Sequence, residues 1–91
     1  MIRPLLPAPY GGLFTYLNGR HADSVVLTFR EIEDLLGFAL PGPARVRQEW
    51  WDGVDARGDP TPQSRAWTAA SRSAKSNLFA RVVTFERTAP L

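Results

Sequence analysis

Arginine is the residue type in this chain with the greatest capacity to hold an anionic ligand. Ten of the eleven basic residues are Arg, and residues 61–91 carry five basic side chains against one acidic side chain, Glu86. A guanidinium forms paired hydrogen bonds with phosphate oxygens and with the edge of guanine. The excess of positive charge in the last third of the chain therefore indicates contact with a nucleic acid.

Two predicted surfaces carry most of these basic side chains. One is a helix expected over residues 43–52, and the other is a C-terminal hairpin together with the short helix before it. We predict nucleic-acid contacts from seven residues, namely Arg45, Arg47, Gln48, Arg65, Arg72, Lys75 and Arg81. Four phosphate contacts would give a salt dependence of binding with a slope of about 3.6. The alternative is that Arg45 pairs with a nearby carboxylate and the other side chains are merely solvated.

The tryptophans offer a different chemistry. The tryptophans lie at helical spacing, and in a small domain such Trp side chains are usually buried in the core. Neighbouring residues on a helix diverge by about 100°, so either Trp50 or Trp51 points away from the core. We predict that Trp50 or Trp51, together with Arg47, contacts a protein partner. Stacking on unpaired bases is the less favoured alternative.

The chain lacks the residue sets that most metal sites and many hydrolases require. It has no Cys and a single His, His21. These counts exclude thiolate metal sites and cysteine nucleophiles. Three carboxylates in one loop do not have the spacing of a calcium-binding loop, namely Asp52, Asp55 and Asp59. We therefore expect no enzyme activity, no cofactor and no metal site.

Length and composition suit one small domain. A chain of 91 residues has room for one modest core, and its net charge of +2 excludes the strongly acidic surface of a DNA mimic. No apolar run approaches the length of a membrane span, so we expect a cytoplasmic protein with no membrane partner. We expect an irregular arm over residues 1–9, one domain over 10–87 and a tail over 88–91. A homodimer is compatible with the sequence.

Local patterns predict the elements that position these side chains. Apolar residues at helical spacing predict a helix over residues 10–18, and a β-branched run predicts a strand over 24–27. Thr28 and Glu31 form a capping box that predicts a helix from Phe29 to the residue before Gly37. This helix has one apolar stripe, and we expect its acidic residues to face water.

The second half of the chain predicts two more helices and a hairpin. Pro43 suits the first turn of a helix that ends near residue 52, and Thr61 with Pro62 predicts the start of another short helix. Residues 73–79 and 81–85 predict the two strands of a hairpin. The order is helix, strand, helix, helix, short helix, hairpin. It indicates an α+β fold with a three-stranded sheet, similar to a winged helix-turn-helix.

The ordered motifs resemble an uncharacterised family of small bacterial domains of unknown function. Its pattern is LTFxEIExxLGxxLPxSAR, then a WW pair, then QARAWxxAG and a final VxFxR. The chain matches this pattern at residues 27–29, 31–33, 36–37, 40–41, 44–45, 50–51, 66–67 and 83–87. Pro43 stands where the pattern has Ser, Ser64 interrupts its Gln-Ala-Arg run, and Ser71-Arg72 replaces its usual Gly-Trp. The resemblance implies a domain identity without an assigned activity.

The sequence supports two functions. The favoured one is a small DNA-binding, winged-helix-like protein, a regulator or accessory factor, that contacts double-stranded DNA. The alternative is a protein-interaction module, such as an inhibitor or adaptor encoded by a phage or another mobile element. Such a module would bind a larger protein of defence or nucleic-acid processing.

Overall fold

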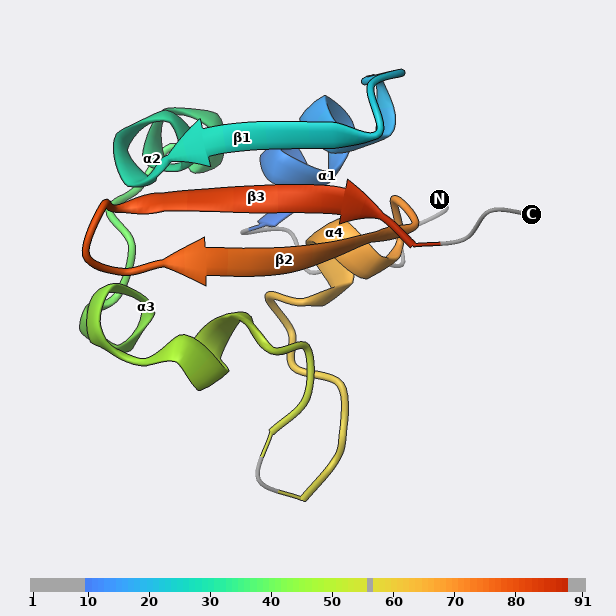
Figure 1. Ribbon diagram of the computed structural model, residues 1–91. Helices are drawn as coiled ribbons and strands as arrows, with labels where there is room; N and C mark the ends of the chain where they lie inside the picture. Colours follow the sequence, from blue (N-terminus) through green and yellow to red (C-terminus); the bar gives the residue numbers. More distant parts are fainter. Residues whose placement is uncertain (1–9, 56, 89–91) are drawn as a thin grey trace, which may run out of the picture.

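Helices and a small antiparallel sheet form an α+β fold in the computed structural model, which describes residues 10–55 and 57–88 (Figure 1). The predicted arm over 1–9 and most of the predicted tail lie outside the described residues. In chain order, the elements are α1 (Gly11–Asn18), β1 (Ser24–Thr28), α2 (Phe29–Leu36), α3 (Gly42–Val46), the 3-10 helix η2 (Gln48–Trp51), α4 (Arg65–Thr68), β2 (Arg72–Asn77) and β3 (Val82–Arg87).

The sheet has three antiparallel strands in the order β1-β3-β2. Its central strand β3 pairs Val83 with Leu27 of β1 and Phe85 with Ala74 of β2. Side chains alternate between the two faces of a strand, so Leu27, Val83 and Phe85 share the buried face. The predicted α+β fold, with one early strand joining a C-terminal hairpin, is confirmed.

Helices cover one face of this sheet. Figure 1 shows α1 and α4 behind the sheet, α2 at the end of β1, and α3 near the turn between β2 and β3. The buried core joins the sheet to these helices through a set of apolar side chains: Leu13, Leu17, Val25, Leu27, Phe29, Ile32, Leu40, Ala44, Trp51, Ala66, Trp67, Ala70, Val83 and Phe85. None of the helices in the described ranges is long and apolar enough to cross a membrane.

Helix α2 forms as its sequence predicts. The Thr28 Oγ1 accepts the Glu31 amide at 3.0 Å, and the Glu31 carboxylate accepts the Thr28 amide at 2.8 Å, which completes the capping box. Gly37 ends the helix with φ 85°, a left-handed conformation that Gly adopts without strain. Phe29 and Ile32 are buried on its inner side.

The helix predicted over residues 43–52 is wrong as one continuous element. Helix α3 ends at Val46, Arg47 is extended with φ −121° and ψ 119°, and η2 follows. In a continuous α-helix the Ala44 carbonyl would accept the amide of Gln48. It instead accepts the indole N–H of Trp51 at 2.8 Å, which draws that ring into the core. The helix therefore ends early, and the free Ala44 carbonyl bonds the buried Trp51 ring instead of the next helical amide.

Helix α4 begins later than predicted from Thr61 and Pro62. It spans Arg65–Thr68, although Thr61 does accept the Ser64 amide at 3.3 Å, as an N-cap would. The single hydrogen of the buried Ser64 hydroxyl is shared between two carbonyl oxygens, those of Gly53 at 3.0 Å and Thr61 at 2.8 Å from the Oγ. These contacts join Ser64, just before α4, to Gly53 at the start of the preceding loop.

Candidate nucleic-acid interface

Three arginines from separate elements meet at one end of the sheet. Arg30 belongs to the first turn of α2, Arg45 to α3, and Arg81 to the turn that joins β2 to β3. They line a cleft of about 330 Å³, which we name the arginine cleft. Its lining consists of Thr28, Phe29, Arg30, Glu33, Arg45, Ala80 and Arg81. Three arginines against one carboxylate, which pairs with Arg45, give the lining of this cleft an excess of positive charge.

The hairpin turn is fixed to the start of α2. The Phe29 amide, at the first position of the helix, donates to the Arg81 carbonyl oxygen at 2.9 Å. Arg81 itself has φ 60°, a conformation that costs a non-Gly residue free energy, and its amide donates to the Asn77 carbonyl at 2.8 Å. The capping box of α2 and this bond together fix the backbone next to Arg30 and Arg81, which both line the cleft.

Glu33 orients Arg45. One oxygen of the half-buried Glu33 carboxylate accepts the Leu40 amide at 2.7 Å and also the guanidinium of Arg45. The expectation that the acidic residues of α2 all face water is wrong for Glu33, because this carboxylate satisfies the amide of a buried Leu. The alternative raised for Arg45, pairing with a nearby carboxylate, is what the structure shows. The Arg45 side chain is still 41% exposed, so part of it faces water.

Arg47 and Gln48 do not lie on a helix that could enter a groove. Arg47 occupies the extended break between α3 and η2, and its guanidinium lies 3.8 Å from the Glu49 carboxylate. The Gln48 amide donates to the Ser76 carbonyl oxygen at 2.6 Å and joins η2 to strand β2. The side-chain amide of Gln48 is therefore engaged in a hydrogen bond within the domain.

Arg65 and Lys75 are exposed but lie on other elements. Arg65 begins α4, and Lys75 faces outward from β2, where it pairs in register with Thr84. Neither residue lines the arginine cleft. Of the predicted nucleic-acid residues, the structure brings Arg45 and Arg81 together, and it adds Arg30.

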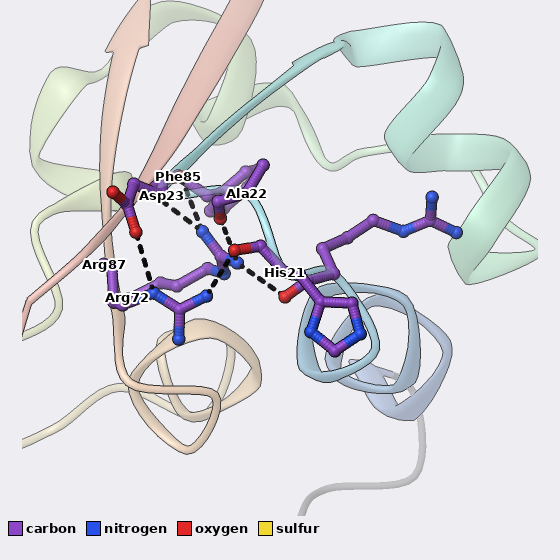
Figure 2. A network of polar contacts seen from close by, with 7 residues as sticks. His21, Ala22, Asp23, Arg72, Phe85 and Arg87 are labelled. Carbon is purple, nitrogen blue, oxygen red and sulfur yellow. Dashed lines mark hydrogen bonds and ion pairs between the residues drawn. The ribbon is translucent and has the colours of Figure 1, made fainter.

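Arg72 is buried rather than displayed on the hairpin. Its relative exposure is 1%, and its guanidinium donates to four carbonyl oxygens, those of Arg20, Ala22, Asp23 and Phe85, at 2.8–3.3 Å (Figure 2). Burial lowers the pKa of Arg72, the charge of Arg87 lowers it further, and Asp23 opposes both. The expected phosphate contact from Arg72 is wrong, because a guanidinium enclosed by carbonyl oxygens has no surface left for a ligand.

Arg87 closes the outer side of the same network. Its Nε lies 3.3 Å from the Asp23 carboxylate, and its Nη2 donates to the His21 carbonyl oxygen at 3.0 Å (Figure 2). The network therefore pins the loop between α1 and β1 to strands β2 and β3. His21 takes part through its backbone, and its side chain is exposed.

The two adjacent tryptophans have different environments. Trp51 is buried, stacked against Phe29 at a ring distance of 5.9 Å and against Trp67 at 5.6 Å, so it is not available to a partner. Trp50 is half-buried and meets Tyr10 edge to face at 6.4 Å. The prediction that one of the pair points away from the core holds only in part, because Trp50 is the more exposed of the two but still packs against the core.

Trp50 borders a second and larger cleft of about 470 Å³, which we name the tryptophan cleft. Its lining combines Trp50 with residues that precede and follow it in the chain: Arg47, Glu49, Asp52, Val54, Asp55, Thr61 and Gln63. The Asp55 carboxylate is occupied, because it accepts the amides of Arg57 at 2.8 Å and Asp59 at 3.0 Å. Within residues 10–55 and 57–88, no three His, Cys, Asp or Glu side chains are placed to hold a metal ion.

Two residues of interest are not predicted by the sequence patterns. Arg30 is not among the residues predicted to contact nucleic acid, and its convergence with Arg45 and Arg81 depends on contacts between segments far apart in the chain. Phe79, in the hairpin turn, is 98% exposed, the highest value among the large apolar side chains that the structure describes as exposed. Phe79 was expected as the last residue of the strand predicted over 73–79, but β2 ends at Asn77, so Phe79 lies in the turn.

Comparison with known proteins gives a family and no function. The family model described as "Domain of unknown function (DUF7662)" matches residues 10–89. No curated protein and no solved structure matches the chain. The resemblance expected from the ordered motifs is confirmed.

Proposed function

The chain belongs to this family of domains of unknown function, and we propose that it is a non-enzymatic protein that binds double-stranded DNA through the arginine cleft. The observation that carries the proposal is the convergence of Arg30, Arg45 and Arg81 from α2, α3 and the hairpin turn. The order of elements and the strand order β1-β3-β2 support a winged-helix-like arrangement, in which the same parts face DNA. The support from the fold is by analogy.

Contacts with the phosphate backbone suit this cleft better than contacts with base edges. An Arg fork binds phosphate oxygens from an exposed, concave site. The short α3 and the engaged amide of Gln48 leave little of a recognition helix to enter the major groove. We therefore propose binding with weak sequence preference. Three phosphate contacts correspond to a salt slope of about 2.7.

The test is fluorescence anisotropy of a labelled random duplex at about 50 and 200 mM salt. We expect micromolar binding of the unmodified protein at the lower salt concentration and a strong loss at the higher one. Arg81→Gln and Arg30→Gln each weaken binding and lower the slope by about one. Arg57→Gln is the control, because Arg57 is exposed and pairs with Asp59 in the loop away from the cleft. Absence of binding at the lower salt concentration would overturn the proposal.

A protein partner is the second candidate function, and the tryptophan cleft supports it. A half-buried indole next to an exposed Arg is the composition of an interface hot spot. A partner bound at this cleft would be lost on Trp50→Ala and on Arg47→Ala. Arg81→Gln would leave it bound, which separates this function from DNA binding.

A further inference from the structure

Phe79 occupies a position that folding alone does not explain. A Phe side chain normally stabilises a domain by leaving water, yet Phe79 is 98% exposed. Its neighbour Leu78 packs against the core, so the turn does bury one apolar side chain and projects the other. The other large apolar side chains described as exposed are less so, at 38–72%. The ring is thus available to a ligand in full.

The turn that carries Phe79 is held firmly. The Asn77 side chain accepts the Ala80 amide at 3.0 Å, and the Asn77 carbonyl accepts the Arg81 amide at 2.8 Å. The Arg81 carbonyl in turn accepts the Phe29 amide at the start of α2. These bonds fix the backbone that carries Phe79 before any ligand arrives, which lowers the entropy cost of ordering the turn on binding.

An excess of positive charge lies beside the same turn. Ala80 and Arg81, the residues that directly follow Phe79, line the arginine cleft with Arg30 and Arg45. A ligand with an anionic backbone and flat aromatic groups satisfies both features at once, and DNA is such a ligand. Proteins that deform DNA insert apolar side chains between base steps while basic residues hold the neighbouring phosphates.

We infer that Phe79 inserts as a wedge against a base step of double-stranded DNA, while Arg30, Arg45 and Arg81 hold the adjacent phosphates. This inference rests on the proposed DNA-binding function. The wedge contributes apolar contact and base stacking, and the arginines contribute the salt-dependent part of binding. The two contributions are therefore separable by experiment.

The test uses a duplex with 2-aminopurine at a central step, because the fluorescence of this base rises when it is unstacked. We expect the full chain to raise the fluorescence. Phe79→Ala abolishes the rise and weakens binding about tenfold, with the salt slope unchanged. Phe79→Trp keeps both the rise and the affinity. Val26→Thr is the matched control, since Val26 is an exposed apolar residue on the outer face of β1.

Each outcome separates the wedge from DNA binding itself. If the full chain binds the duplex and Phe79→Ala binds equally well with the same fluorescence, the wedge is overturned and DNA binding stands. If the full chain binds no duplex at low salt, the proposed function fails first. Binding to anionic phosphatidylglycerol vesicles without binding to the duplex would assign the ring to a lipid surface and overturn the inference. Thermal unfolding of each variant confirms that it is folded.

Discussion

The Glu33 carboxylate and the Arg45 guanidinium form an ion pair between α2 and α3, and the same Glu33 oxygen accepts the Leu40 amide at 2.7 Å. One carboxylate therefore shapes the chain between the two helices and also neutralises part of the charge in the arginine cleft. Glu33 thus stabilises the fold that forms the cleft, but its negative charge weakens the attraction of the cleft for an anionic ligand.

Glu33→Gln is expected to separate these roles. The amide oxygen of Gln can still accept the Leu40 amide, but the ion pair with Arg45 is lost. Stability should fall by about 1 kcal/mol, since the pair is partly exposed, whereas DNA binding at low salt should tighten. Chemical denaturation measures the first effect, and duplex anisotropy the second. Weaker DNA binding by a folded Glu33→Gln protein would contradict the proposed role of the cleft.

Gly12 is expected to tolerate no side chain. A Cβ atom at this position would lie 2.2 Å from the Leu35 carbonyl oxygen of α2, so α1 and α2 would have to move apart. Gly12→Ala should destabilise the domain by about 1–3 kcal/mol. Gly11→Ala is the control, because a Cβ atom added at Gly11 would meet nothing within 4 Å, and this variant should be neutral or slightly stabilising. Urea unfolding of the two variants compares them, and equal stability would refute the close approach.

Ser71 and Arg81 lie at opposite ends of the hairpin, and both have φ 60°. Replacing either with Gly should relieve the left-handed strain and stabilise the domain by about 0.5–1 kcal/mol. The family pattern has Gly at position 71, which agrees with this expectation. Only Arg81→Gly should weaken DNA binding, because Ser71 is remote from the arginine cleft. Thermal unfolding and duplex anisotropy of both variants decide the point, and a loss of binding with Ser71→Gly would contradict it.

The features that the sequence predicts well depend on residues close together in the chain. The capping box joins Thr28 to Glu31 within a single turn, and Gly37 ends the helix through its own backbone freedom. The hairpin and the early strand follow from local alternation. The break at Arg47 was not predictable in this way, because it depends on where the ring of Trp51 is buried.

The site depends more on contacts between distant segments. The pairing of β1 with β3 and the bond from the Phe29 amide bring Arg30 and Arg81 together, and the ion pair with Glu33 brings in Arg45. Arg72 and Arg81 belong to the same hairpin and are the same residue type, yet one is buried and the other exposed. Residue type and charge runs alone do not distinguish them.

Arg72 is expected to contribute to stability and not to DNA binding. Its guanidinium donates to carbonyl oxygens of residues 13–52 positions away in the chain, including those of Phe85 and Arg20. Arg72→Met leaves these acceptors without their donor and should destabilise the domain by about 2–4 kcal/mol. Denaturant unfolding measures this loss. At a temperature where the variant is folded, the salt slope of duplex binding should equal that of the unmodified chain.

Arg87→Met is the matched control for this prediction. Arg87 joins the same network from its outer side, but its side chain is 39% exposed and its Asp23 partner is almost fully exposed. The loss of an exposed ion pair should cost less than about 1 kcal/mol. Equal costs for the two variants would show that burial of the Arg72 guanidinium does not govern the network. A lower salt slope for folded Arg72→Met would instead indicate that Arg72 contacts DNA.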